Sequence, residues 1–238
     1  MSTPAIDTDS RGDSRQVASG RDTTPTYLAP YRDAVVAHGP GFESLLWFNR
    51  DVQQRRFEVF GSVAALADRT VADLGCGHAD FVLWMHEHGI EYDEYVGVEA
   101  IAELADYSRK QIDNNAVPRA LCLRADFVAD ADFFANLVAD YGVDTLVMSG
   151  SLNTLTEDRA KAVLDRAWQA ISRQAGGQLV FNFLCQIEGQ PARDTFLPVP
   201  RFGAKSMFAW ALERTPLVVY CQYYLGGHDA TIAMMAPR

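Results

Sequence analysis

A glycine turn between two carboxylates stands out in the stretch VADLGCGHADF, residues 71–81. Asp73 ends an apolar run, and Asp80 follows the turn. Gly75 and Gly77 permit a positive φ or the close approach of a ligand to the backbone. Because such a turn between a strand and a helix commonly holds the polar part of a cofactor, the charge of the flanking side chains indicates which cofactor it holds.

Two classes of cofactor compete for this turn. The dinucleotide fingerprint GxGxxG seats a pyrophosphate at a helix N-terminus, but Asp80 replaces its third glycine and would repel that pyrophosphate. S-adenosylmethionine carries a sulfonium and an ammonium group, so Asp73 and Asp80 suit it, and the amides around Cys76 can meet its carboxylate. Asp80 alone equally suits a structural role, because acids stabilise the first turn of a helix. The pattern favours S-adenosylmethionine over a nicotinamide dinucleotide.

Two further acids follow the next two predicted strands. Glu99 lies 22 residues after Gly77, at the distance where an acid pairs with the ribose hydroxyls, and Ala100 stands beside it. Asp126 precedes Phe127, and this pair can bond an adenine amino group and cover the ring. Since the carboxyl ends of consecutive parallel strands lie side by side, these residues are expected to trace one adenosine.

Alternating strand and helix patterns must position these residues. Apolar runs predict strands at residues 69–75, 95–100, 119–126, 144–150 and 178–185. Helices are predicted between them at residues 79–89, 101–115, 131–142 and 154–177, the last with a capping box from Thr154 to Glu157. Two β runs, 217–225 and 228–235, indicate a hairpin. We therefore expect an α/β fold: a Rossmann-like, doubly wound, mostly parallel seven-stranded sheet with a C-terminal antiparallel hairpin and helices on both faces.

The chain divides into a tail and a single domain. Residues 1–26 have few large apolar side chains, which predicts a disordered tail. Residues 27–238 are expected to form one domain that begins with a helical cap at 27–68. Residues 186–203 contain three prolines and little periodicity, which predicts a lid over the acceptor site.

The composition of the 238 residues is that of a globular protein, with 48% hydrophobic and 22% charged residues. The net charge of −10 argues against a nucleic-acid partner. No run approaches the ~18 apolar residues of a membrane span, and the N-terminal residues lack the apolar core of a secretory signal, so we expect a cytoplasmic protein without a membrane partner. The four cysteines are scattered, so no metal site is expected.

The motifs VADLGCG, YVGVEA, LRADF and DTLVMSG, in this order, resemble those of class I S-adenosylmethionine-dependent methyltransferases. The similarity covers residues 41–238, and the terminal hairpin resembles the reversed seventh strand of that fold. The segments MSGSLN, VFNFL and YYLGGHDATI are similar to a group of small bacterial methyltransferases. The third glycine of the fuller family pattern is missing near Ala79. The [DN]PP[YF] signature of many N-methylating enzymes is also absent, which disfavours a nucleobase amine as the acceptor.

The resemblance implies transfer of a methyl group by in-line displacement to an oxygen or nitrogen of a small molecule, with S-adenosylhomocysteine as the other product. The acceptor is expected beyond the carboxyl ends of the fourth and fifth predicted strands. The polar residues there are Ser149, Ser151, Asn153, Asn182 and Gln186. Ser149 is predicted to contact the cofactor and Asn153 the acceptor. Ser151 and Gln186 suit ordinary loop hydrogen bonds better.

Two residues outside these motifs complete the predicted site. His228 follows the hairpin turn and is predicted to act as a general base, with a hydrogen-bonded turn residue as the alternative. Arg56 lies in a basic cluster with Arg50 and Arg55 that also suits a solvated helix face or, less well, a nucleic-acid contact. In the resembling fold, this helix packs over the methionine end of the cofactor, which implies that Arg56 pairs with the cofactor carboxylate. A non-catalytic S-adenosylmethionine-binding protein and an NAD(P)-dependent oxidoreductase remain the alternative functions.

Overall fold

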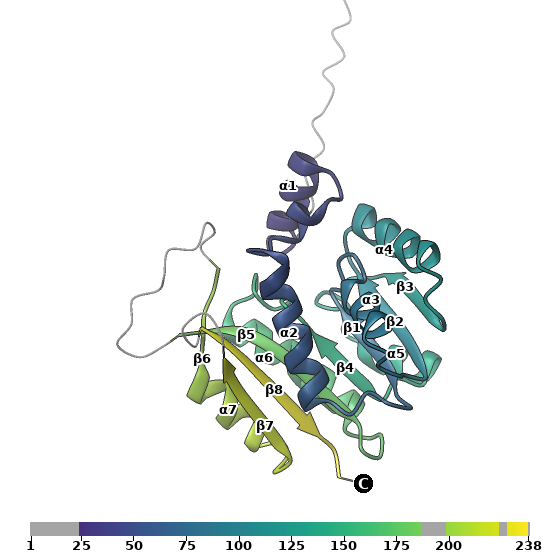
Figure 1. Ribbon diagram of the computed structural model, residues 1–238. Helices are drawn as coiled ribbons and strands as arrows, with labels where there is room; N and C mark the ends of the chain where they lie inside the picture. Colours follow the sequence, from purple (N-terminus) through teal and green to yellow (C-terminus); the bar gives the residue numbers. More distant parts are fainter. Residues whose placement is uncertain (1–23, 187–198, 224–227, 238) are drawn as a thin grey trace, which may run out of the picture.

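The computed structural model of the protein describes residues 24–186, 199–223 and 228–237 (Figure 1). Its strands are β1 (Thr70–Leu74), β2 (Glu94–Glu99), β3 (Ala120–Arg124), β4 (Thr145–Met148), β5 (Gln178–Gln186), β6 (Phe202–Gly203), β7 (Val218–Tyr223) and β8 (Asp229–Met235). Its helices are α1 (Ala29–His38), the 3-10 helix η1 (Phe42–Leu45), α2 (Arg50–Val63), α3 (Asp80–Glu87), α4 (Ala102–Asn114), α5 (Phe133–Tyr141), α6 (Glu157–Ile171) and α7 (Ala204–Leu212).

The central sheet has the strand order β3-β2-β1-β4-β5-β8-β7, and the short β6 pairs with β5. Strands β1 to β5 are parallel to one another, whereas β8 is antiparallel to both β5 and β7. The predicted mostly parallel sheet with a C-terminal antiparallel hairpin is confirmed. Because the strand order reverses direction between β1 and β4, their carboxyl ends form the switch point at which open α/β sheets bind ligands.

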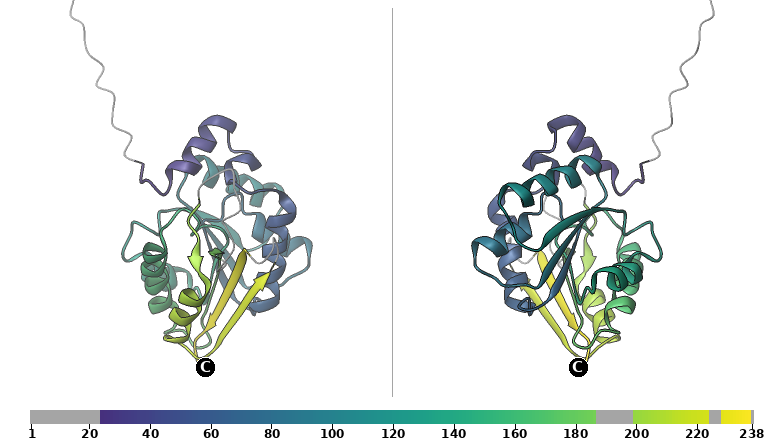
Figure 2. Two further views of the ribbon diagram at one scale, coloured as in Figure 1. Left: turned by 90° about the vertical axis from the view of Figure 1, so that its left-hand side faces the viewer. Right: turned by 90° about the vertical axis from the view of Figure 1, so that its right-hand side faces the viewer.

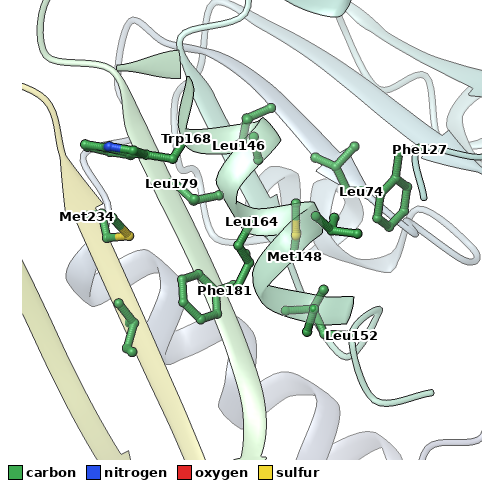
Figure 3. Close-up of a cluster of buried hydrophobic side chains, with 14 of the residues drawn as sticks. Leu74, Phe127, Leu146, Met148, Leu152, Leu164, Trp168, Leu179, Phe181 and Met234 are labelled. Carbon is green, nitrogen blue, oxygen red and sulfur yellow. The ribbon is translucent and has the colours of Figure 1, made fainter. Parts of the chain in front are cut away.

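Residues along each strand alternate between two apolar layers, because successive side chains point to opposite faces. Leu146, Met148 and Phe181 join the core under α5, α6 and α7 (Figure 3). Val147 and Val180 join a second core with residues of α2, α3 and α4. Figure 2 shows helices on both sides of the sheet, so the predicted doubly wound arrangement is also confirmed.

The N-terminal helices α1, η1 and α2 lead into the first strand; α1 and η1 lie at one end of the sheet, whereas α2 runs along one of its faces (Figure 1). Helix α2 starts after Asn49, whose side-chain Oδ1 accepts a hydrogen bond from the amide of Val52 at 2.8 Å. Phe57 and Phe60 of α2 pack their rings against Phe81 of α3, with centroids 5.2 and 6.0 Å away. This aromatic contact fixes α2 against the helix that follows the glycine turn.

Helix α6 begins two residues later than the sequence predicts. Its N-cap is Thr156, whose Oγ1 accepts a hydrogen bond from the amide of Arg159 at 3.4 Å. The predicted capping box from Thr154 is therefore wrong, because Leu155 is buried and the chain enters the helix only after it. Both threonines satisfy a simple capping pattern, so only the backbone path decides between them.

Helix α7, which directly follows the predicted lid at residues 186–203, is absent from the sequence prediction. Of the predicted lid, only residue 186 and residues 199–203 are described, and all but residues 24–26 of the predicted tail lie outside the described residues. Within the described ranges, no helix is long and apolar enough to span a membrane.

Candidate active site

A cavity of about 1000 Å³ lies at the carboxyl ends of the first four strands, with α1, η1 and α2 forming part of its wall. Every residue predicted to bind the cofactor or to act in catalysis lines this cavity: Arg56, Asp73, Gly75, Cys76, Gly77, Glu99, Ala100, Asp126, Phe127, Ser149, Asn153 and His228. The structure thus brings together residues from positions 56 to 228 of the chain. Its volume is at the upper end of the range for small-molecule sites, which leaves room for a cofactor and a second molecule.

The glycine turn approaches its neighbours too closely for any side chain. Gly75 and Gly77 have φ values of +77° and +57°. A Cβ atom at Gly75 would lie 2.6 Å from the Cβ of Ser151, and one at Gly77 would lie 2.8 Å from Cδ2 of Leu45. The amide of Gly75 donates to the carbonyl of Val98 at 2.7 Å, which ties the turn to β2. The glycines therefore keep the floor of the cavity open.

Cys76 takes part in this turn mainly through its backbone. Its thiol is buried, with its Sγ 3.7 Å from the Sγ of Cys122. The interaction with Cys122, together with burial, raises the pKa of the Cys76 thiol well above its usual value. The thiol is therefore neutral near neutral pH, which excludes a role as a nucleophilic thiolate.

Asp73 is held in the wall of the cavity with only 3% of its surface exposed. The hydroxyl of Tyr95 donates to its Oδ2 at 2.8 Å. Burial raises the pKa of Asp73 to about 7, with the charges of Glu99 and Asp80 adding to the rise and the Tyr95 hydrogen bond opposing it. A buried acid of this kind is stabilised in its charged form by a cation bound in the cavity.

Glu99 connects the end of β2 to the glycine turn. Its Oε2 accepts from the amide of Gly77 at 3.1 Å, and its Oε1 accepts from the amide of Ile101 at 2.9 Å. Burial raises the pKa of Glu99 to about 7, against the lowering effect of these backbone hydrogen bonds. Each carboxylate oxygen has a second lone pair, so Glu99 can accept from both hydroxyls of a diol without losing its present bonds.

Asp126 lies at the far side of the cavity and contacts the N-terminal segment. The hydroxyl of Tyr27 donates to its Oδ2 at 2.5 Å, while its Oδ1 accepts from the amides of Val128 and Ala129 at 3.0 and 3.1 Å. Burial and this bond to Asp126 raise the pKa of Tyr27. The guanidinium of Arg159 stacks over the Tyr27 ring at 4.4 Å. Tyr27 therefore covers this end of the cavity beside the predicted adenine contact.

Phe127 follows Asp126 and belongs mainly to the core. Its ring packs against Phe133 and Phe134, with centroids 6.5 and 6.1 Å away. Because the residue is 7% exposed yet lines the cavity, it presents only a small apolar surface to a ligand. This limits how much of an adenine ring Phe127 can cover.

Asp80 lies both in the first turn of a helix and in the wall of the cavity. It is the first residue of α3, where its charge is favourable, and it also lines the cavity. Its Oδ2 accepts from Nε2 of Gln53 in α2 at 2.8 Å. This bond links the N-terminal helices to the helix after the glycine turn.

Arg56 forms a buried ion pair across the molecule. Its Nη2 lies 2.5 Å from Oδ1 of Asp229 in β8, and its guanidinium stacks on the Trp47 ring at 4.7 Å. Its Nε atom is buried and has no hydrogen-bond partner in the described part of the chain.

Tyr31 of α1 lines the same cavity. Burial raises the pKa of Tyr31 to about 12, with the Glu99 charge adding to the rise and Arg56 opposing it.

His228 contacts a second arginine, which we did not predict. Nη1 of Arg201 lies 3.2 Å from Nδ1 of His228 and 3.5 Å from the carbonyl oxygen of Cys185. Because a guanidinium can only donate, Nδ1 must accept, and the neutral imidazole then carries its proton on Nε2. In this geometry His228 is a hydrogen-bond donor at Nε2. Its predicted action as a base would require the Arg201 contact to break.

The polar residues after β4 divide into two groups. Asn182 accepts from the amide of Gly150 at 2.8 Å and donates to Ser149 at 3.4 Å, so it shapes the loop and does not line the cavity. Ser151 and Asn153 do line the cavity. Their Oγ and Oδ1 atoms are buried without a hydrogen-bond partner among the residues described. The exposed residue 186, also named from the sequence, lies outside the cavity wall.

Sequence reasoning missed many residues of the cavity wall, among them Tyr27, Tyr31, Trp47 and Arg201. Tyr27, Tyr31 and Trp47 come from the segment before the first strand, and the aromatic residues in that segment were the available signal. Arg201 had no comparable signal, because only the fold brings it next to His228.

No protein-family model and no curated protein matches this sequence. Solved structures match the fold. The S-adenosylmethionine-dependent methyltransferase SibL, in its apo form, is 17% identical with a TM-score of 0.62, covering 87% of this chain and 62% of its own. Phosphoethanolamine N-methyltransferase 1 from Haemonchus contortus, solved with phosphoethanolamine and S-adenosylhomocysteine, is 13% identical with a TM-score of 0.61, covering 89% and 48%.

The cyclase SpnF also has this fold, with 13% identity, a TM-score of 0.59 and coverage of 89% of this chain and 93% of its own. The chain spans less than two thirds of the length of SibL and of the Haemonchus contortus enzyme. The fold is therefore that of the class I S-adenosylmethionine-dependent methyltransferases, as the sequence resemblance predicts. Because SpnF is a cyclase, the fold by itself does not specify the reaction.

Proposed function

We propose that this protein binds S-adenosylmethionine and transfers its methyl group to a small-molecule acceptor. The observation that carries the proposal is the set of acids around the open glycine turn. Asp73 and Glu99 are buried in the wall of a cavity of about 1000 Å³, and burial raises the pKa of each to about 7. Such a site gains from a ligand that brings positive charge and hydroxyl donors, and it disfavours a pyrophosphate.

The residues of the chain fit the parts of this cofactor in a definite order. Asp73 would accept from the ammonium group, and Glu99 would accept from the ribose hydroxyls. Asp126 would accept from the adenine amino group through the oxygen that now accepts from Tyr27. The pairing of Arg56 with the cofactor carboxylate stays a prediction, since its Nη2 already contacts Asp229.

When bound, S-adenosylmethionine supplies a methyl group on a positively charged sulfur that a nucleophile displaces in line. The part that the protein plays is to align the acceptor and exclude water. Asn153 and Ser151, whose buried oxygen atoms lack partners among the described residues, would orient the acceptor. His228 would donate a hydrogen bond from Nε2, because its Nδ1 accepts from Arg201.

A binding protein that does not transfer the methyl group is a second candidate. The contact between Arg201 and Nδ1 of His228 favours this candidate. For Nε2 of His228 to act as a base, Nδ1 must carry the proton, but Nδ1 accepts a hydrogen bond from Arg201. An oxidoreductase is disfavoured, because Asp73 and Asp80 both line the cavity where a pyrophosphate would bind.

Calorimetry followed by a transfer assay tests the proposal. The full-length protein is expected to bind S-adenosylhomocysteine and not NADH. Incubation with S-adenosylmethionine labelled on its methyl group, together with a metabolite mixture, is then expected to yield a labelled small molecule. Binding of NADH in place of S-adenosylhomocysteine would rule out S-adenosylmethionine as the cofactor. Tight binding without transfer to any fraction would favour the second candidate.

A further inference from the structure

The charges that line the cavity are separated by sign. The described acids of the wall lie at η1, α3 and the ends of β1, β2 and β3: Glu43, Asp80, Asp73, Glu99 and Asp126. The described arginines of the wall, Arg56 and Arg201, contact the other half of the sheet, at β8 and β5. The acidic half of the cavity suits the cationic cofactor. The half that contains the arginines is then available to the methyl acceptor, which must bind beside the cofactor.

Arg201 is held in place by neutral groups. Its Nη1 contacts Nδ1 of His228 and the carbonyl oxygen of Cys185, and no carboxylate in the described ranges lies within ion-pair distance of it. The amide of Cys185 in turn donates to the carbonyl of His228 at 2.8 Å, which fixes both partners to β5. Arg201 is thus a positioned guanidinium with further N–H groups available to a ligand.

The charge of this end of the cavity matches a single negative charge. Arg56 is paired with Asp229, so their charges cancel, and the tautomer imposed on His228 is neutral. Arg201 then contributes one positive charge that lacks a matching acid among the described residues. The buried Nε of Arg56 adds a donor without a partner in the described part of the chain. A ligand with two negative charges would bind less favourably. The carboxylate of Asp229, on the other side of the Arg56 guanidinium, would repel its second charge.

We infer that the methyl acceptor carries a carboxylate, which binds Arg201 beside His228. The inference rests on the proposed methyl transfer and assigns the chemical class of its acceptor. Guanidinium groups bind carboxylates through paired N–H donors, and Nε2 of His228 supplies another donor on the same side. Apolar residues that line this end, Leu184 and Val199, suit the carbon skeleton of the acceptor.

The carboxylate anchors the acceptor and is not the atom that is methylated. A guanidinium withdraws electron density from a carboxylate that it binds, so the bound oxygens are poor nucleophiles. The methyl group is therefore expected on another oxygen or nitrogen of the same molecule. The product keeps the carboxylate, which makes the inference testable on the product alone.

Matched pairs of probes test the anchor in the protein saturated with S-adenosylhomocysteine. Benzoate, 3-phenylpropanoate and hexanoate are each compared with their primary amide by ligand-observed NMR and calorimetry, and phenyl phosphate is added as a second anion. The acids are expected to bind about tenfold or more tightly than the amides. Arg201→Gln is expected to abolish this preference, and Arg201→Lys to retain part of it, because lysine keeps the charge and loses the paired donors.

Arg173→Gln, a change of an exposed arginine at the end of α6, is the matched control and should leave the preference intact. The affinity for S-adenosylhomocysteine should be the same in all of these proteins. Equal binding of acids and amides, failure of every acid to bind, or an unchanged preference in Arg201→Gln would each overturn the inference. Stronger binding of phenyl phosphate than of benzoate would replace the carboxylate with a phosphate and also overturn it.

The labelled product gives an independent result. A methylated product that contains a free carboxylate is expected, whatever its net charge, and a product without a carboxylate would overturn the inference while leaving the proposed methyl transfer in place. If instead S-adenosylhomocysteine does not bind at all, the proposed function itself fails, whatever the result for the contact between Arg201 and a carboxylate. The two failures are therefore distinguishable.

Discussion

At the scale of single residues, Glu99 joins the cofactor turn to the predicted ribose site. Replacing it with Gln keeps the size of the side chain and removes one acceptor from the pair that now receives the amides of Gly77 and Ile101. We expect Glu99→Gln to weaken binding of S-adenosylhomocysteine by about 1–3 kcal/mol in calorimetry, because a hydrogen bond to a charged acceptor is lost.

Adenosine and 2′,3′-dideoxyadenosine separate a ribose contact from a change in the turn. Glu99→Gln should weaken the binding of adenosine and leave that of the dideoxy compound nearly unchanged. The matched control is Glu103→Gln, a change of an exposed acid in the first turn of α4. An affinity for S-adenosylhomocysteine that is unaffected by Glu99→Gln would remove Glu99 from the site.

Gly75 offers a second prediction at the residue scale. Gly75→Ala is expected to lower the free energy of unfolding by about 2 kcal/mol or more, because an alanine must adopt φ +77° and its Cβ would lie 2.6 Å from that of Ser151. Gly89→Ala is the control for backbone strain alone, since Gly89 has φ +62° and a Cβ atom added there would have no neighbour within 4 Å. Its expected cost is about 1 kcal/mol.

Chemical denaturation measures both variants. The difference between them reports the close approach of the loop after β4 to the glycine turn. Adding Ser151→Gly to Gly75→Ala should recover part of the loss, because it removes the atom that clashes. Equal costs for Gly75→Ala and Gly89→Ala would show that Ser151 can move away freely.

At the scale of elements, the local sequence pattern predicted most strands and helices, but it did not predict the residues at which they begin and end. The five parallel strands were predictable because short apolar runs that alternate with helical patterns leave few other options. Helix α7 was missed because its sequence follows a stretch rich in proline and has no capping residue, its N-cap being Gly203 without a side-chain bond. The sequence favours a start of α6 at Thr154 because Thr154 and Glu157 have the spacing of a capping box, whereas the actual N-cap, Thr156, has Arg159 at that position.

The N-cap of α6 gives a direct test of that correction. Thr156→Ala is expected to lower the free energy of unfolding by about 0.5–1 kcal/mol, because the amide of Arg159 loses its acceptor. Thr154→Ala is the matched control and should cost less, since Thr154 precedes the helix by two residues. Thermal and chemical denaturation give both values, and a larger loss for Thr154→Ala would restore the original capping box.

At the scale of the whole molecule, the two buried acids of the cavity couple folding to pH. The pKa of Asp73 is about 7 in the folded protein against a usual 3.8, so the folded state retains a proton that the unfolded state releases. Stability falls with rising pH wherever the folded state binds more protons. The contribution of Asp73 is therefore present below about pH 4 and is lost as the pH rises through about 7.

Asp73→Asn should remove this dependence. We expect the variant to be more stable than the wild type at about pH 8, by on the order of 2 kcal/mol, and to lose that advantage towards about pH 4. The side-chain oxygen of the introduced asparagine can still accept from Tyr95, so the packing is retained. Denaturation at several pH values without ligand measures the effect, with Asp106→Asn on the exposed face of α4 as the control. Parallel pH profiles for wild type and Asp73→Asn would contradict the prediction.

The sequence alone determined the alternation of strands and helices up to β5, the parallel sheet, the terminal hairpin and the positions of the glycine turn and its acids. These follow from local periodicity and from spacing along consecutive strands, which a chain carries in its own pattern. Only the tertiary structure decided that Tyr27 covers Asp126, that Arg56 pairs with Asp229 and that Arg201 contacts His228. Each of these contacts joins residues far apart in the chain, and no local pattern encodes which distant side chain fills the space that folding creates.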